Sequence, residues 1–375
     1  MSHRRVRVAW LHPVIAHYRV PILNKVESDV RLEVTHFAGD ESSGVSVADA
    51  SGEVEGRVVR LTNVRIPRRP NVIYAIGWSR VVRGGFDVVL TSEAVHNVVN
   101  WLLLLLRPFF DYKLIVVGHI RPSGDAMRLA TNLRRSYVRR ADGIIAYSEE
   151  GARQALAWGV AKKRITVWGN TLDLDRIKKA RENIEPDRIA LLREKLLGDK
   201  RAVAFLGRPT PAKRPEVAID TILELERRGF PVVLFVIGDS AEVPGLRKRA
   251  AGSENVRFVG AEFSEERIAE YLSLSEMVFI PGAVGLSAVH AFAYGRPLLT
   301  WKLAPHRPEM EAARHGWNCC LVEECSAAAF ADAIVKLLTD KGELARLAEG
   351  AGATPLNSAD AMAAAIVERV LNVVQ

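Results

Sequence analysis

A loop in the second half of the chain carries two positively charged side chains directly after a buried strand. Gly207 ends the apolar run 203–206, and Arg208 and Lys213 follow it, five residues apart, before a helical pattern begins. Two fixed cations beside the free N–H groups of a helix N-terminus make a binding site for a doubly charged anion. The segment therefore predicts a pyrophosphate site, and a solvated basic loop is the alternative interpretation.

Two further turns in the same half have residues that suit a ligand. Gly282 and Gly285 let the backbone approach a ligand closely, and Ser287 is expected to cap the next helix, whose N-terminus would face an anion. Gly238 and Asp239 end another strand, which is a weaker pattern because many strand-to-helix turns share it. In an open α/β sheet, such strand ends are where the chain turns toward a ligand crevice.

These turns require strands, and short β-branched runs alternate with helical patterns along the whole chain. The runs lack strict apolar–polar alternation, which predicts parallel strands covered by helices on both faces. We therefore expect an α/β fold with a doubly wound sheet in each half. The expected strands are 6–11, 32–37, 88–91, 114–117, 144–147 and 165–167, and then 203–206, 232–237, 256–259, 277–280 and 298–300.

Length and composition agree with two domains of this kind. The chain has 375 residues, 49% of them hydrophobic and 26% charged, and a domain has roughly 100–200 residues. This composition excludes collagen-like, low-complexity and wholly disordered proteins. We expect an N-terminal domain over 1–175, a charged linker helix over 176–199, a C-terminal domain over 200–355, and a final helix over 356–375 that could pack back on the first domain.

Charge and cysteine content narrow the class of protein further. The net charge of +8 suits a partner that bears phosphate or anionic lipid, and no helix-turn-helix, zinc-finger or RNA-binding pattern indicates nucleic acid. Cys319, Cys320 and Cys325 are too few for a disulfide framework and match no zinc spacing. We therefore expect a cytoplasmic protein without a metal site, and the N-terminal residues lack the pattern of a signal peptide.

The most apolar segment, 98–106, is shorter than the ~18–20 residues that a membrane span needs. A buried helix is one interpretation. A shallow interfacial helix is the other, because Trp, Leu and Phe beside Arg suit a headgroup boundary. The second interpretation predicts a peripheral contact with an anionic membrane.

The second half resembles the retaining GT-B glycosyltransferases of family four, the glycosyl transferases group 1. The resemblance lies in the order and spacing of short segments, and the first half adds Tyr-Arg-Val-Pro at 18–21. It covers about residues 5 to 340 and implies two Rossmann-like domains that face each other across a deep cleft. The matching segments are 205–213, 238–239, 255–260, 284–297, 308–309 and 315–318 in the second half, and 18–21, 141–148 and 165–173 in the first.

The resemblance implies roles for individual residues. Arg208 and Lys213 would grip the diphosphate of a nucleotide-sugar donor, and His119 would orient the sugar or steady charge at the transition state. The cations and the helix end would do the work of a divalent metal, so none is expected, and UDP or GDP is the expected nucleotide of a donor that is substrate rather than cofactor. The implied donor-binding residues are Gly207, Arg208, Lys213, Gly238, Asp239, Gly282, Gly285, Leu286, Ser287, His290 and Glu309.

Acceptor contacts are expected from the loop that follows the first strand, at His12, His17, Tyr18 and Arg19. A structural role beside Pro13 is the alternative for His12. Another strand end carries Ser92, Glu93 and His96, which could form a polar edge facing the crevice or cap the next helix.

The chain departs from the family at two positions. The family usually has two glutamates around the glycine loop, the first touching the donor sugar and the second the ribose, and here Gly282 and His290 stand there. His290 could take over a ribose hydrogen bond or could simply belong to the helix. The departure leaves open a variant site or a degenerate copy that binds without catalysis.

We therefore expect a retaining, metal-independent glycosyltransferase that acts on a growing glycan or a lipid-linked acceptor. Closure of the two domains would bring His119 to the sugar. Two alternatives remain, a nucleotide-sugar epimerase on the same scaffold and a catalytically inactive nucleotide- or glycan-binding module.

Overall fold

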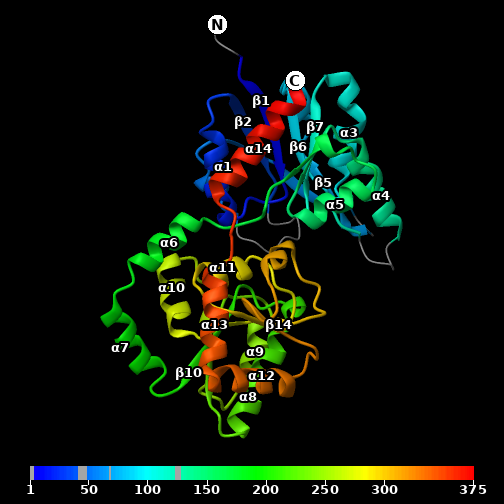
Figure 1. The fold of residues 1–375 in the computed structure, drawn as a ribbon. Helices are drawn as coiled ribbons and strands as arrows, with labels where there is room; N and C mark the ends of the chain where they lie inside the picture. Colours follow the sequence, from blue (N-terminus) through cyan, green and yellow to red (C-terminus); the bar gives the residue numbers. More distant parts are fainter. Residues whose placement is uncertain (1–3, 41–48, 67–68, 123–127) are drawn as a thin grey trace. The chain divides into compact units, whose positions relative to one another are not determined.

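The computed structural model describes residues 4–40, 49–66, 69–122 and 128–375. The chain divides into two compact units (Figure 1). One comprises Met1–Asp173 together with Asn357–Gln375, and the other comprises Leu174–Leu356. Each unit has its own sheet and its own core.

The first unit contains a seven-stranded sheet in which every adjacent pair of strands is parallel. The order across the sheet is β3-β2-β1-β6-β7-β8-β9, so the chain builds outward from β1 on one side and then from β6 on the other. The strands are β1 (Val6–His12), β2 (Leu32–Ala38), β3 (Arg57–Arg60), β6 (Val88–Ser92), β7 (Lys113–Gly118), β8 (Gly143–Ala146) and β9 (Ile165–Val167).

Successive residues of these strands enter two different cores, as the pleat of a strand requires. Trp10 and Ile115 belong to a core shared with α1 (Val20–Glu27) and α14 (Ala359–Val374). Leu11 and Val116 belong to the opposite core, which is covered by α2 (Ser79–Arg83), α3 (Val98–Phe110), α4 (Arg128–Arg140) and α5 (Glu149–Ala157).

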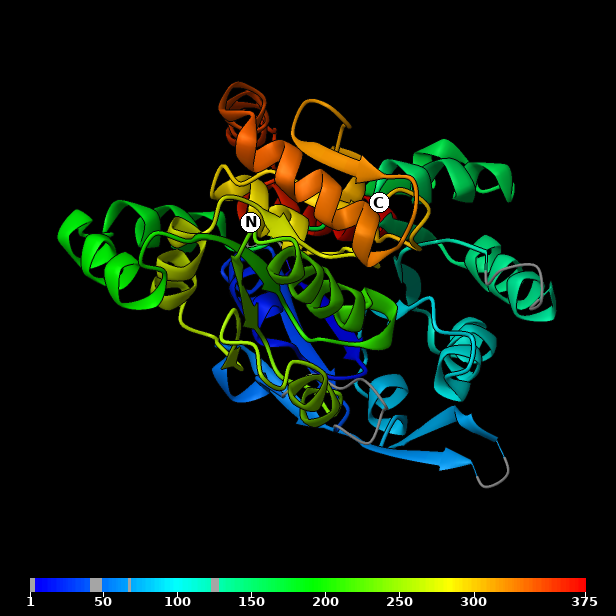
Figure 2. The same cartoon turned by 90° about the horizontal axis from the view of Figure 1, so that it is seen from below.

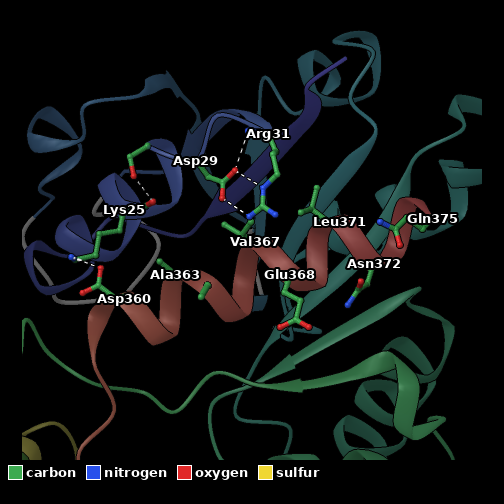
Figure 3. Close-up of a pocket in the computed structure, with 12 residues that line it drawn as sticks. Lys25, Asp29, Arg31, Asp360, Ala363, Val367, Glu368, Leu371, Asn372 and Gln375 are labelled. Atoms are coloured by element: carbon green, nitrogen blue, oxygen red, sulfur yellow. Dashed lines mark hydrogen bonds and ion pairs between the residues drawn. The ribbon is translucent and has the colours of Figure 1, made fainter. Parts of the chain in front are cut away.

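The C-terminal helix α14 is an integral part of the first unit, where it lies beside α1 (Figure 1). Met362, Ile366 and Val370 recur four residues apart and are at most 1% exposed. Its outer side forms an open polar groove of about 640 Å³ with α1, bordered by the ion pair of Lys25 and Asp360 at 2.6 Å (Figure 3). Arg31, at the amino end of β2, also lines this groove, which is therefore far along the sheet from the carboxyl ends of the strands.

Beside the main sheet, β4 (Thr62–Ile66) and β5 (Arg69–Ile76) form an antiparallel hairpin. Figure 2 shows its two strands side by side. The sequence analysis missed this hairpin, as well as β3 and β15 (Cys319–Val322), because these strands are short or carry charged residues among the apolar ones. The parallel strands that it did predict are all present.

The second unit contains a six-stranded parallel sheet in the order β12-β11-β10-β13-β14-β15. Here the chain starts at β10, moves outward to β12, and then returns to add β13 on the other side of β10. The remaining strands are β10 (Arg201–Leu206), β11 (Val232–Ile237), β12 (Val256–Gly260), β13 (Val278–Phe279) and β14 (Leu298–Trp301), and the helices between and after them are α8 (Pro215–Arg227), α9 (Val243–Arg249), α10 (Glu265–Leu274), α11 (Ser287–Ala293), α12 (Ala327–Thr339) and α13 (Lys341–Gly352).

The segment 176–199, expected to be one linker helix, contains two helices, α6 (Leu174–Glu182) and α7 (Pro186–Leu196). Pro186 begins α7 because its fixed backbone angle suits the first turn of a helix and not its interior. Both helices contact α10, and Arg188 Nε lies 2.9 Å from Glu270 Oε1, so the segment is part of the second unit.

The fold class expected from the sequence, two doubly wound α/β domains, is confirmed.

Helix α3 has one buried face, with Val99 and Leu103 fully covered, and an outer face on which Leu105 and Phe109 are 66% and 80% exposed. Across the described part of the chain, no helix has the length and apolarity that crossing a bilayer would need.

The packing of α14 yields a stability prediction. Ile366→Ala should lower the free energy of unfolding by about 2–5 kcal/mol, because it opens a cavity in a fully packed core. Val374→Ala on the same helix, where the side chain is 38% exposed, should change it by less than about 0.5 kcal/mol. Urea unfolding of the two variants measures the difference, and equal values would mean that α14 does not stabilise the first unit.

Candidate functional site

The second unit has its strand-order reversal between β10 and β13, and both strands end at the same edge of the sheet. In open α/β sheets, ligands bind at the carboxyl ends of the strands at such a reversal. The loops that follow these two strands are 207–214 and 280–286, which contain the predicted basic residues and glycines. Topology thus brings together the two segments that the sequence analysis had identified separately.

Lys213 turns back toward the end of β10. Its Nζ donates a hydrogen bond to the Leu206 carbonyl oxygen at 3.1 Å and lies 5.8 Å from the centre of the Phe205 ring. Burial, and then the nearby Arg208, lower the pKa of Lys213 to about 8. The ammonium is therefore held where strands β10 and β13 end, and its charge is poorly solvated.

The loops after β10 and β13 are joined by their backbones. Gly282 N donates to the Lys213 oxygen at 2.9 Å, and Ala283 N donates to the Ala212 oxygen at 2.7 Å. A Cβ atom at position 282 would overlap the Ala212 oxygen and lie 2.6 Å from the Lys213 carbonyl carbon. No side chain fits there, so this backbone contact requires glycine where the family usually has glutamate.

The turn after β11 lies against the same loop. The Ser240 hydroxyl donates to the Pro209 oxygen at 2.6 Å, and Asp239 Oδ1 accepts from Ser240 N at 2.8 Å. Gly238 has a φ of +146°, and a Cβ there would lie 2.5 Å from the Gly207 oxygen. The Arg208 side chain, next along the loop, is exposed at this edge.

The segment after β14 borders the glycine loop on its other side. Arg307 N donates to the Val284 oxygen at 2.8 Å, and a Cβ at Gly285 would lie 3.8 Å from Glu309 Oε2. The predicted donor residues Gly285 and Glu309 are therefore neighbours, and Glu309 is only 9% exposed.

Ser287 does not cap α11, contrary to the expectation. It is the first residue of this seven-residue helix, Leu286 occupies the cap position, and no side chain makes a capping hydrogen bond. The Ser287 hydroxyl is buried and has no hydrogen-bond partner among the described residues. The chain enters the helix in a helical conformation at Leu286, which leaves no extended residue for a serine cap.

His290 is held by a carboxylate on α10. Its Nε2 lies 3.3 Å from Glu265 Oε2, and the Tyr294 hydroxyl donates to Glu265 Oε1 at 3.0 Å. Burial acts to raise the pKa of Glu265, but the hydrogen bonds from His290 and Tyr294 lower it overall. The partner of His290 in this structure is thus Glu265, and no spacing rule connects positions 265 and 290.

In the first unit, the strand-order reversal lies between β1 and β6. Glu93, after β6, accepts hydrogen bonds from His119 N and Ile120 N, both at 2.9 Å, and lies 3.6 Å from Arg134 Nε. Burial raises the pKa of Glu93, and Arg134 and the two N–H groups partly offset this effect. Glu93 therefore fixes the loop that carries His119. The alternative that these residues cap the following helix is wrong, because Asn97 is the N-cap of α3.

Arg19 lies over three aromatic rings at the same edge. The guanidinium carbon is 4.7 Å from the Trp168 ring centre, 5.1 Å from that of Tyr147 and 5.4 Å from that of Tyr18. The ring of His119 meets that of Tyr147 edge-on, with 4.7 Å between centres. Arg19, Tyr18 and His119 are thus brought into one cluster.

His12 adjoins this cluster from the end of β1. Its Nε2 is 3.0 Å from His36 Nδ1, and its ring is 5.0 Å from that of Trp10, which in turn contacts Trp168. Burial, then His36 and Arg19, lower the pKa of His12 well below its usual value. His17 is exposed and contacts Tyr18 edge-on.

Sequence reasoning gave no role to Tyr147, Trp168 or Glu265. A usable signal existed for two of them, because Tyr147 and Trp168 each come directly after a strand, where side chains of a parallel sheet meet a ligand. Glu265 begins a helix, and nothing local distinguishes it from an ordinary acidic residue of a first helical turn.

Comparison with known proteins agrees with this geometry. The family model described as Glycosyltransferase Family 4 matches residues 31–176, and the model described as Glycosyl transferases group 1 matches residues 200–340. The chain belongs to this glycosyltransferase family. The matched residues include the whole sheet and both candidate loops of the second unit, and every strand of the first sheet except β1.

A curated relative, D-inositol 3-phosphate glycosyltransferase from Nocardia farcinica, is 29% identical over 72% of this glycosyltransferase chain and 62% of its own length. Anabaena HepE, solved with UDP and glucose, has a TM-score of 0.70 at 18% identity, covering 97% of this chain and 99% of that one. A UDP-N-acetylglucosamine 2-epimerase has a TM-score of 0.60 at 12% identity, covering 96% and 94%. These neighbours confirm the GT-B fold.

The contact at Gly282 yields a second prediction. Gly282→Ala should destabilise the second unit by about 1–3 kcal/mol. The added methyl group would overlap backbone atoms of Ala212 and Lys213, which cannot shift without moving the rest of their loop. Gly245→Ala, in helix α9 with open space around the added atom, should be neutral or slightly stabilising. Thermal unfolding of the two variants measures the difference. A Gly282→Ala variant as stable as the wild type would contradict the requirement for glycine at position 282.

Proposed function

We propose that this chain transfers a sugar, with retention of anomeric configuration, from a nucleoside diphosphate sugar to an acceptor hydroxyl. The observation that carries the proposal is the ammonium of Lys213, fixed at the strand reversal beside a glycine loop. Arg208 stands in the same loop. Together they supply two positive charges where such folds bind ligands.

The chemistry that these charges support is departure of a nucleoside diphosphate. Negative charge develops on the leaving phosphate as the glycosidic bond breaks, and fixed cations in a poorly solvated site stabilise it most. Loss of one such donor commonly costs about 10²–10³ in rate. Lys213 and Arg208 would supply this stabilisation without a divalent metal, and backbone groups of Gly285 to Ser287 would contact the same phosphates.

The remaining residues complete the proposal. His119 would orient the reacting sugar or steady its charge, with Glu93 as the positioning residue for its loop. UDP or GDP is the proposed nucleotide, and the UDP bound by Anabaena HepE supports the first.

The acceptor would bind at the cluster around Arg19. The product would be a glycan or glycolipid, and the exposed apolar side of α3 supports a peripheral membrane contact.

The epimerase alternative has one observation in its favour, the fold that it shares with this chain. The two reactions differ in their need for an acceptor, since epimerisation converts the donor alone. Product that forms only when acceptor is present excludes the epimerase. Donor binding by calorimetry with no transfer to any acceptor would instead favour an inactive binding module.

Substitution of Lys213 tests the proposed leaving-group site. Lys213→Ala should abolish transfer and weaken UDP binding about tenfold or more, because a charge-assisted hydrogen bond is lost. Lys248→Ala, exposed on α9, removes the same charge from the same unit and should leave both unchanged. Calorimetric titration with UDP and a transfer assay measure the two effects. Full activity of folded Lys213→Ala would overturn the assignment.

The lowered pKa of Lys213 predicts a pH dependence. Below about pH 7 the ammonium is charged, and as the pH rises through about 8 the free enzyme loses this charge. UDP affinity should therefore fall between about pH 7.5 and 9.5, by up to about tenfold per pH unit. Lys213→Arg keeps its charge and should show a flat profile. A flat wild-type profile would mean that the ammonium does not bind UDP.

A further inference from the structure

Arg19 is the one residue of the acceptor cluster whose chemistry indicates a specific ligand group. It is the last residue of the 3₁₀ turn after β1 and directly precedes α1, at the edge where the first sheet reverses its strand order. Three rings from three different segments, those of Tyr18, Tyr147 and Trp168, surround its guanidinium within 4.7–5.4 Å. A planar cation held on aromatic faces has a defined orientation.

This guanidinium lacks a protein counter-ion within the described ranges. Arg19 forms no ion pair with a carboxylate there, and its Nη1 is closed off from solvent without a hydrogen-bond partner. Other arginines of the same unit do have partners, as in the pairs of Arg107 with Asp142 and Arg60 with Asp49. A buried donor without a partner costs about 1–3 kcal/mol, and more when it is charged.

Among the described residues of this unit, the carboxylates of Glu27, Asp49 and Glu93 form ion pairs with side chains other than Arg19. A titratable neighbour, His12, has its pKa lowered in part by Arg19 itself, which favours a neutral imidazole. Two carboxylates of the same unit are occupied elsewhere. Glu93 accepts the N–H groups of the His119 loop, and Glu27 lies 2.8 Å from His36. The positive charge of Arg19 therefore lies against aromatic rings without a paired carboxylate among the described residues.

We propose that Arg19 binds an anionic group of the acceptor, a phosphate or a carboxylate. Guanidinium presents paired N–H donors that match both groups bidentately, and stacking on ring faces does not use these donors. The Arg19 side chain is half-buried, so part of it remains accessible to a ligand. The ring of His119 contacts Tyr147, which also contacts Arg19. An anion on Arg19 would therefore anchor the acceptor beside the residue proposed to act on the sugar. This inference rests on the proposed function and specifies its acceptor class.

The test uses inorganic phosphate as the probe and the full chain with saturating UDP, so that the donor site is filled. Trp168 lies against Arg19, so its fluorescence reports on binding at this cluster. Phosphate, compared with chloride at equal ionic strength, should change the fluorescence and saturate. Arg19→Gln should weaken this binding about tenfold or more, and Arg19→Lys should weaken it less, since it keeps the charge but loses the bidentate geometry.

Two controls separate the possible failures. Arg135→Gln, exposed on α4, removes one positive charge of the same unit and should leave phosphate binding unchanged. Lys213→Ala should weaken UDP binding but keep phosphate binding at Arg19, so the inference and the proposed function fail independently. The inference is overturned if folded Arg19→Gln binds phosphate as the wild type does, or if its substitution weakens UDP binding instead, which would make Arg19 a donor contact.

Discussion

The backbone contact between the loops after β10 and β13 is the constraint on which the second unit's site depends. Gly282 and Ala283 donate to the oxygens of Lys213 and Ala212, so two backbone hydrogen bonds join the loops. The same contact holds the backbone of Lys213 in place while its ammonium bonds to the end of β10. Lys213 is thus oriented by two neighbouring backbone segments, the end of β10 and the loop after β13, which is how a partly desolvated cation can be preorganised for a diphosphate.

In the first unit, a side chain holds the loop that carries a site residue. The carboxylate of Glu93 accepts two consecutive backbone N–H groups, those of His119 and Ile120, and so fixes the turn after β7. Ile120 has a φ of +49°, a conformation that costs energy for a β-branched residue and needs such support. In both units, the residues proposed to bind ligands therefore stand on loops whose backbones are held by specific hydrogen bonds.

The departures from the family at positions 282 and 290 have a structural context. Glycine at 282 allows a backbone approach that any Cβ would prevent, and His290 is joined to Glu265 instead of standing alone. A carboxylate is still present beside position 290, but it is supplied by α10. Both positions are thus integrated into the packing of the second unit, and neither is a random surface residue.

The sequence by itself determined most helices and strands, because the spacing of apolar residues along a segment shows which of its residues are buried. It located most of the parallel strands, the glycine turns, the basic loop and the final helix. Only the tertiary structure decided that α14 packs on α1, that Glu93 holds the His119 loop, that Arg19 lies among Tyr18, Tyr147 and Trp168, and that Glu265 meets His290. These contacts join residues far apart in the chain, and strand order decides which loops become neighbours. Periodicity carries no information about that order, so the chemistry of each residue could be predicted from the sequence while its partners could not.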